Sequence, residues 1–175
     1  QVGALLAVTP EGPMRDNLIT LKETLSNGMD SIRRSIHNLH DASIDLHAEI
    51  YRILKGFTFC PVDFIDDLEE KPDLPVIYCL LAVIKEALSN ISKHSDATEV
   101  KLILREHPAL YQLIIRDNGS KPVQGLVLSP EGEYIPGSQG MGLKSIFERV
   151  ERLNGNVRIT IDNGFEVFVS IPKGS

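Results

Sequence analysis

The chain has 175 residues, 42% of them hydrophobic, a formal net charge of −6 and a calculated pI near 5.4. This hydrophobic content supports a packed core and excludes a disordered chain. The acidic balance argues against a nucleic-acid-binding protein, which needs a basic face for phosphates. No apolar run approaches the roughly 20 residues that span a bilayer, and no signal peptide is visible. We therefore expect a cytoplasmic region, with any membrane attachment of a parent protein lying upstream of Gln1.

The first part of the chain carries a helical pattern. Apolar residues recur at steps of three and four along residues 16–57, close to a heptad repeat, with Ser43 filling the one gap. This spacing predicts a long amphipathic helix whose narrow apolar stripe needs a partner helix. A turn at residues 9–13 precedes it, as in a helical hairpin. We therefore assign residues 1–56 to a partial dimerisation hairpin and residues 57–175 to a second domain.

The second part shows mixed α and β patterning. Helical spacing covers residues 75–95 and 142–153, whereas strand patterns cover four segments, at residues 99–104, 111–116, 156–161 and 166–171. Residues 121–139 are rich in Gly, Pro and Ser. A loop of about 20 residues inside a compact domain usually forms a lid or a binding loop. The pattern predicts an α+β domain with one long functional loop.

A polar edge follows the first of these predicted helices. Glu86, Asn90, Lys93 and His94 recur at spacings of four, three and one, which places them on one edge of the helix. The edge offers a carboxylate, an amide oxygen suited to a hard cation such as Mg²⁺, and two possible partners for phosphates. Taken alone, such a motif more often forms a solvated polar helix face than a binding site.

The first predicted hairpin ends in Asp117-Asn118-Gly119. Such a segment forms simple turns in many proteins. A carboxylate at a strand end can also accept a hydrogen bond from an exocyclic amine such as that of adenine, and a glycine lets the backbone approach the base closely. Both interpretations stay open for this motif alone.

Glycines precede the second predicted helix, in the segment Gly140-Met141-Gly142-Leu143. The free backbone N–H groups and the positive dipole at a helix N-terminus attract phosphates. A flexible hinge is the alternative interpretation of this short glycine motif.

The order and spacing of the three motifs resemble the N, G1 and G2 boxes of the ATP-binding superfamily of histidine kinases, gyrase, Hsp90 chaperones and mismatch-repair ATPases. The resemblance covers about residues 57–173. The string from Lys85 to Asn90, followed by Lys93-His94-Ser95, is similar to sensor histidine kinases whose partners are response regulators with helix-turn-helix, LuxR-type output domains. The resemblance implies a two-layer α/β sandwich of the Bergerat type, with helices on one face of a mixed sheet, preceded by a long dimerisation helix.

The resemblance also implies that the chain binds ATP with Mg²⁺. Asp117 would hold the adenine amine, Gly119 would pack under the base, and Asn90 would coordinate the Mg²⁺ that bridges the phosphates. Residues 121–139 would close over the nucleotide as a lid. The contacts at the start of the second helix would come from four consecutive residues, Gly140, Met141, Gly142 and Leu143.

Three residues would take part in catalysis by the same resemblance. Glu86 would act as a base or orient the reacting group, Asn90 would act through its metal ion, and Lys93 would neutralise phosphate charge together with His94. Two positions depart from the family pattern. Lys121 replaces a usual glycine, and Phe165 replaces a threonine whose hydroxyl commonly supports the adenine-binding aspartate.

The phosphoacceptor histidine of such a kinase has candidates on the predicted long helix, namely His37, His40 and His47. Leu39-His40-Asp41 superficially resembles a His-Asp acceptor motif, in which the adjacent acid polarises the imidazole. However, the family places a whole second helix between acceptor and N box, and too few residues separate His40 from Glu86. We therefore expect the acceptor upstream of Gln1, with His40 as a helix-surface residue.

The leading interpretation is the ATP-binding catalytic region of a two-component sensor histidine kinase. In the parent protein, a homodimer through the N-terminal helices, the γ-phosphoryl group would pass from ATP to a histidine and then to an aspartate of a response regulator. One alternative is a nucleotide-binding signalling module without transfer activity. Another is an ATP-hydrolysing relative of the gyrase and chaperone branch, in which Glu86 activates water.

Overall fold

The structure is a computed structural model that describes residues 44–120, 141–161 and 164–174. The chain divides into two compact units, Gln1–Ile44 and Asp45–Ser175. The second unit contains eight described elements, in the order α3 (Leu46–Gly56), β1 (Val62–Asp67), α4 (Leu74–His94), β2 (Val100–Glu106), β3 (Leu110–Asp117), α5 (Met141–Glu151), β4 (Asn156–Ile161) and β5 (Phe165–Pro172).

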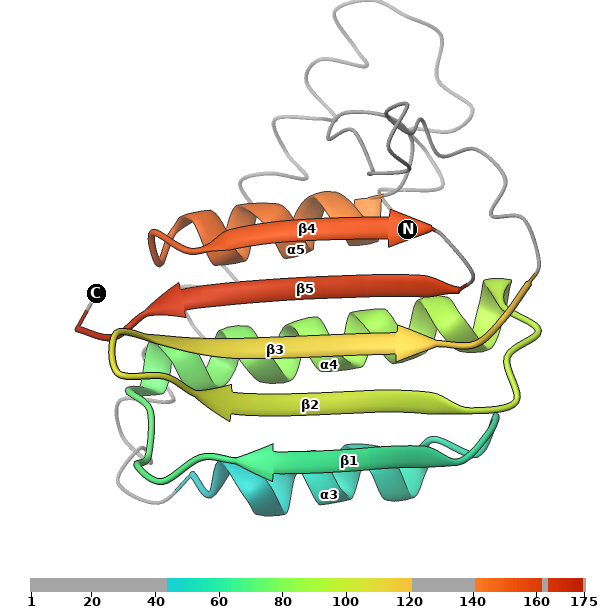
Figure 1. Ribbon diagram of the computed structural model, residues 1–175, viewed down its shortest axis with the longest axis horizontal. Coiled ribbons are helices and arrows are strands. Elements are labelled where there is room, and N and C mark those ends of the chain that lie inside the picture. The colour runs from blue at the N-terminus through green and yellow to red at the C-terminus, as the bar shows by residue number, and fades with distance from the viewer. Residues whose placement is uncertain (1–43, 121–140, 162–163, 175) are drawn as a thin grey trace, which may run out of the picture. The chain divides into compact units, whose positions relative to one another are not determined.

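The five described strands form one mixed sheet with the order β1-β2-β3-β5-β4. The pair β1 and β2 is parallel, and the other three pairs are antiparallel. The three described helices lie behind one face of this sheet (Figure 1). This arrangement confirms the predicted α+β sandwich with helices on one face of a mixed sheet.

Strand β1 was not predicted from the sequence. Half of its six residues are aspartates, which are depleted in strands. Its place at the sheet edge accommodates them, because two of the carboxylates pair with cations of β2. Asp63 Oδ2 lies 3.6 Å from Lys101 Nζ, and Asp67 Oδ2 lies 3.2 Å from Arg105 Nε. Since β1 and β2 are parallel, a crossover must join them, and α4 is that crossover.

The core lies between the sheet and the helices. Along β3 and β5 every second residue is buried, as expected when one face of a sheet packs on helices. The inward residues of β5 are Phe165, Val167, Val169 and Ile171. The opposite wall is mostly α4, whose buried residues include Ile77, Leu80, Ile84, Leu88 and Ile91.

Helix α4 is apolar because it is the core helix. Within the described part of the chain it is the one helix long and apolar enough to cross a membrane by length and composition, with a window of mean hydropathy 1.6. However, 56% of that window is buried inside the structure. Packing against the sheet therefore accounts for the composition of α4.

Helix α3 begins later than the sequence pattern predicted. Asp45 is extended (φ −90°, ψ 108°), and its Oδ1 accepts hydrogen bonds from the backbone N–H groups of His47 (3.0 Å) and Ala48 (3.2 Å). An N-cap of this kind starts a helix. The prediction of one continuous helix over residues 16–57 is therefore wrong at Asp45. Helix α3 buries Leu46 and Ile50 and packs against α4, within the same unit as the sheet. The rest of the predicted hairpin, with His37 and His40, lies outside the described residues.

Glu106 ties together the end of the sheet opposite Asp117. Its Oε2 accepts hydrogen bonds of 2.8 Å from the backbone N–H groups of Glu69 and Glu70. Its Oε1 accepts a hydrogen bond from the Lys173 ammonium, which lies 5.4 Å from the centre of the Tyr111 ring. The Lys173 hydrogen bond, followed by the two backbone N–H groups, lowers the pKa of Glu106 to about 2. The segment between β1 and α4 is thereby fixed to the sheet.

Candidate functional site

Asp117 is a buried carboxylate at the end of a strand. It is the last residue of β3 and is 2% exposed. Its Oδ1 accepts hydrogen bonds from the Gly119 N–H (2.6 Å) and the Ser95 hydroxyl (3.0 Å). Its Oδ2 is buried and has no hydrogen-bond partner among the described residues. A buried acceptor without a partner costs about 1–3 kcal/mol. The atom is therefore suited to a donor brought by a ligand.

The segment after α4 is fastened to the segment after β3. Asn118 Oδ1 accepts hydrogen bonds from the N–H groups of Thr98 (2.9 Å) and Glu99 (3.1 Å). Asp96 Oδ1 accepts a hydrogen bond from the Ser120 N–H (2.8 Å). These contacts, together with the one from Ser95 to Asp117, hold the end of α4 at the carboxylate. Sequence reasoning missed Ser95, Asp96 and Asn118 as parts of the site. Ser, Asp and Asn side chains often form hydrogen bonds with nearby backbone groups, and this tendency could have indicated their role from the sequence.

Two glycines allow the close packing around Asp117. A Cβ atom on Gly119 would lie 2.2 Å from Ser95 Oγ and 2.8 Å from Asp117 Oδ1. Gly164 has a φ of +125°, and a Cβ atom there would lie 2.0 Å from the Asp117 carbonyl oxygen. Phe165, where the family resemblance led us to look for a hydroxyl, is 8% exposed and belongs to the core. The backbone therefore packs closely around Asp117. Among the described residues, Ser95 is the side chain that donates a hydrogen bond to its carboxylate.

Glu86 lies against the first turn of α5. A Cβ atom on Gly142 would lie 1.8 Å from Glu86 Oε1, so the structure brings these two predicted site residues together. The backbone N–H groups of a first helical turn lack intrahelical partners and attract negative charge. The neighbouring Leu143 is 6% exposed, with its side chain in the core. Only the backbone of Leu143 is therefore available to a phosphate.

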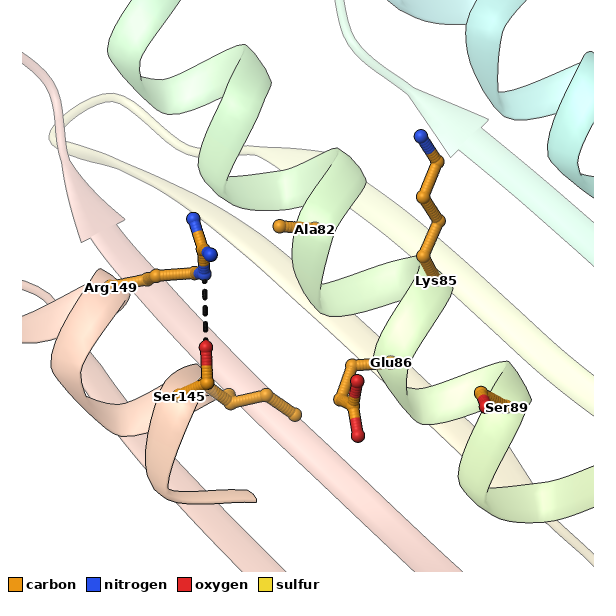
Figure 2. A pocket seen from close by; sticks show the side chains of 7 residues that line it. Ala82, Lys85, Glu86, Ser89, Ser145 and Arg149 are labelled. Carbon is orange, nitrogen blue, oxygen red and sulfur yellow. Dashed lines mark hydrogen bonds between the residues drawn. The ribbon is translucent and has the colours of Figure 1, made fainter. Parts of the chain in front are cut away.

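A polar pocket of about 370 Å³ opens between α4 and α5. Figure 2 shows side chains of α4 on one wall and of α5 on the other, with Glu86 reaching between them. Arg149 Nε donates a hydrogen bond of 3.2 Å to Ser145 Oγ. The lining residues are Ala82, Lys85, Glu86, Ser89, Ser145, Ile146 and Arg149. The pocket thus combines one carboxylate, two cations and two hydroxyl groups.

The last turns of α4 connect Glu86 to Asp117. The helix runs without interruption to His94, and the next residue, Ser95, contacts Asp117. Nine residues of helix correspond to roughly 14 Å, comparable with an extended nucleoside triphosphate. Asn90 is half-buried on this stretch, and Lys93 and His94 are exposed in its last turn. The predicted helix over these residues is confirmed, and their roles toward a ligand stay predictions.

The start of α5 is described only in part. Met141 is its first residue, whereas Gly140, Lys121 and the predicted lid lie outside the described residues. Among the candidate acceptors, His47 lies on α3 with its Nε2 2.7 Å from Asp66 Oδ2. That contact joins α3 to β1, away from the Asp117 end of β3.

The donor set suits a metal ion that arrives with its ligand. In the described ranges no group of three or more His, Cys, Asp or Glu residues could hold a metal. Mg²⁺ commonly takes one or two protein oxygens and completes its shell with water and substrate phosphates. The half-buried amide of Asn90 fits that partial role.

No family model matches the chain. The chain is 31% identical over 162 residues to the signal transduction histidine-protein kinase/phosphatase UhpB of Salmonella typhimurium, covering 87% of this chain and 30% of UhpB. It is 25% identical over 174 residues to the sensor histidine kinase DesK of Bacillus subtilis, covering 98% of this chain and 44% of DesK. The chain thus spans less than half the length of these two relatives.

A solved structure shares the fold. The ATP binding domain of PrrB from Mycobacterium tuberculosis superposes with a TM-score of 0.55 and 19% identity, covering 74% of this chain and 92% of that domain. The described sheet and helices therefore have the fold of a histidine kinase ATP-binding domain. The sequence relatives are likewise sensor histidine kinases, in agreement with the resemblance seen in the three motifs.

Proposed function

We propose that this chain is the ATP-binding catalytic region of a two-component sensor histidine kinase. The observation that carries the proposal is the buried Asp117, whose Oδ2 lacks a partner among the described residues at the end of β3. The similarity to sensor histidine kinases along 87% of the chain supports it. In the proposed reaction the γ-phosphoryl group of ATP passes to a histidine and then to an aspartate of a response regulator.

The proposed base site discriminates by hydrogen-bond polarity. Asp117 Oδ2 is an acceptor, so it suits the exocyclic amine of adenine and repels the carbonyl oxygen of a 6-oxopurine. Gly119 has no side chain and is itself buried, which leaves its backbone close to the carboxylate. A base lying on this backbone would place its amine at Asp117.

The proposed phosphate site lies along α4 toward α5. Asn90 would hold Mg²⁺, and Lys93 and His94 would neutralise phosphate charge, as would the backbone N–H groups at the start of α5. Phosphoryl transfer depends mainly on positioning and on charge stabilisation. When bound, Mg²⁺ supplies much of that charge stabilisation.

Glu86 is the proposed base or orienting group for the acceptor histidine. Its carboxylate lies between the first turn of α5 and the polar pocket between α4 and α5 (Figure 2). A pocket of about 370 Å³ has room for an imidazole ring. An imidazole entering there would meet Glu86 beside the proposed phosphate site, within reach for proton transfer or orientation.

The whole protein is proposed to act as a homodimer through its N-terminal helices, on the cytoplasmic side of any membrane anchor. Its proposed partner is a response regulator with a LuxR-type output domain. The proposal derives from the sequence motif that begins at Lys85 and from the sensor kinases among the relatives. The acceptor histidine is proposed to lie upstream of Gln1.

Calorimetric titration of ATP and ADP with Mg²⁺ tests the nucleotide site. The Asp117→Asn variant keeps the size of the side chain but can present a donor to the adenine amine. Since hydrogen bonds to charged groups contribute about 1.5–3 kcal/mol, we expect affinity to fall by about 10- to 150-fold. Asp63→Asn, on an exposed ion pair of the sheet, is the matched control and should bind as the unmodified chain does. Absence of nucleotide binding by the unmodified chain would contradict the proposal.

A transfer assay separates the kinase from a signalling module that only binds nucleotide. Phe165, buried where a supporting hydroxyl was expected, is the observation that favours the second candidate. The chain is supplied with γ-labelled ATP and the helical segment that precedes it in its parent protein. Label on a histidine supports the kinase, whereas nucleotide binding without label supports the signalling module.

A further inference from the structure

Ser95 joins the end of α4 to the buried carboxylate. It is the C-cap of α4, where its N–H donates to the Ile91 carbonyl oxygen (2.9 Å). Its hydroxyl lies 3.0 Å from Asp117 Oδ1 and 3.1 Å from the Ala97 nitrogen. It is also the described side chain that a Cβ atom on Gly119 would strike first, at 2.2 Å. Ser95 is thus packed against both predicted base-binding residues.

The neighbours of Ser95 fix the direction of its hydroxyl proton. The Ala97 N–H is a donor, so Ser95 Oγ must accept there. The carboxylate of Asp117 is an acceptor, so the hydroxyl must donate to it. A serine hydroxyl can otherwise rotate between donor and acceptor roles. Held between these two groups, it occupies Oδ1 and leaves Oδ2 free.

The arrangement fixes the orientation of the carboxylate as well. Oδ1 receives two hydrogen bonds, from Ser95 and Gly119, whereas Oδ2 receives none from the described residues. Rotation about the bond to the carboxylate carbon would break both contacts at Oδ1. The charge of Asp117 is therefore held so that one particular oxygen stays available to a ligand.

We propose that Ser95 is a positioning residue that sets the base specificity of the site, by orienting Asp117 so that Oδ2 accepts a hydrogen bond from the 6-amino group of a purine. The inference rests on the proposed nucleotide-binding function. It assigns a role to a residue outside the polar edge of α4, and it gives the site a supporting hydroxyl although Phe165 provides none. Removing that hydroxyl should weaken recognition of the amine while leaving the rest of the nucleotide contacts in place.

The test compares ATP with purine riboside triphosphate, which lacks the 6-amino group, by calorimetric titration with Mg²⁺. The unmodified chain should bind ATP more tightly than the analogue. In Ser95→Ala, ATP affinity should fall by about 5- to 10-fold, from the loss of one charge-assisted hydrogen bond, and affinity for the analogue should stay unchanged. Ser95→Thr, which retains a hydroxyl, should restore the preference for ATP.

Ser92→Ala is the matched control. Ser92 is an exposed serine one turn earlier on α4, and its hydroxyl donates to the Ser89 carbonyl oxygen (3.0 Å) rather than to the site. It should leave both affinities unchanged. Thermal unfolding of each variant checks that α4 is intact.

Each other outcome identifies which idea has failed. If Ser95→Ala lowers the affinity for ATP and for the analogue equally, Ser95 only supports the fold. If it lowers neither affinity, Ser95 has no role in the site. Either result overturns the inference. A failure of the proposed function shows in the unmodified chain instead. There, no binding of either nucleotide refutes the nucleotide site, and equal binding refutes the contact between Asp117 and the amine.

Discussion

Gly164→Ala should destabilise the domain through its contact with Asp117. Gly164 precedes β5 at a φ of +125°, a conformation that side chains disfavour. The added methyl carbon would lie 2.0 Å from the Asp117 carbonyl oxygen. That oxygen belongs to the backbone at the end of β3, so it cannot rotate away as a flexible side chain would. The ends of β3 and β5 must separate or the turn must change its conformation.

The expected cost follows from two effects. A residue with a side chain held in a disfavoured backbone conformation costs about 1–3 kcal/mol. Overpacking that forces a backbone shift costs a further 1–3 kcal/mol or so. The alanine also restricts the unfolded chain, which offsets about 0.4–1 kcal/mol. The net loss of roughly 1–6 kcal/mol is a large share of the 5–15 kcal/mol or so that stabilises a typical domain.

Urea unfolding monitored by far-UV circular dichroism measures this loss. Gly56→Ala is the control, because a Cβ atom at Gly56 meets nothing within 4 Å and the residue ends α3. It should lie within about 0.5 kcal/mol of the unmodified chain. ATP affinity of Gly164→Ala should also fall, because Asp117 moves. If Gly164→Ala unfolds like the control, β5 does not constrain Asp117 as described, and the reasoning is refuted.

Two further changes test other parts of the domain. In Gly142→Ala, the added methyl group would contact only the flexible end of the Glu86 side chain, so the chain should stay folded and keep its ATP affinity within a few-fold. Label transfer in the acceptor assay should fall at least about 10-fold, because Glu86 is displaced. Unchanged transfer would show that the position of Glu86 is unimportant. Glu106 has a pKa near 2, below its ordinary 4.5, so its stabilising effect is complete above pH 4.5 and is lost as the pH falls toward 2. The unfolding midpoint of the unmodified chain should therefore fall more steeply over that range than that of Glu106→Gln. Parallel curves would show that the hydrogen bonds of Glu106 to Lys173, Glu69 and Glu70 do not stabilise the domain.

The sequence predicted the elements whose patterns are local. The apolar spacing of α4, the hairpin of β2 and β3, and the terminal hairpin of β4 and β5 are all confirmed. These elements bury one face each, so their periodicity reports their environment directly. The same reasoning placed Asp117 at a strand end and Glu86 on the helix, which the structure confirms.

The elements that were missed depend on partners distant in sequence. Strand β1 is recognisable only beside Lys101 and Arg105, which balance its aspartates. The break at Asp45 was hidden because Leu46 and Ile50 continue the apolar spacing of the preceding segment across the cap. Periodicity alone does not reveal where a helix begins within a continuous apolar spacing.

The site itself shows the same division. Asp117 was found from its motif, but Ser95 was not, because the contact joins the end of α4 to the end of β3, 22 positions apart. Conversely, the family pattern has a hydroxyl-bearing residue after Gly164, where this chain has Phe165, which is buried in the core. A sequence motif identifies the group that binds a ligand more readily than the groups that orient it.

The inward face of β3 gives an independent reason to connect Asp117 with function. Its buried positions are Tyr111, Leu113, Ile115 and then Asp117, so a carboxylate takes the fourth place of an otherwise apolar or aromatic row. An apolar residue there would complete the core without the cost of burying an acceptor that the described residues leave unpaired. Natural sequences depart from such local consistency mainly at functional sites. A serine and two close-packed glycines also hold this carboxylate in place. The free-energy cost of burying Asp117 is therefore best explained by a ligand that donates a hydrogen bond to Oδ2.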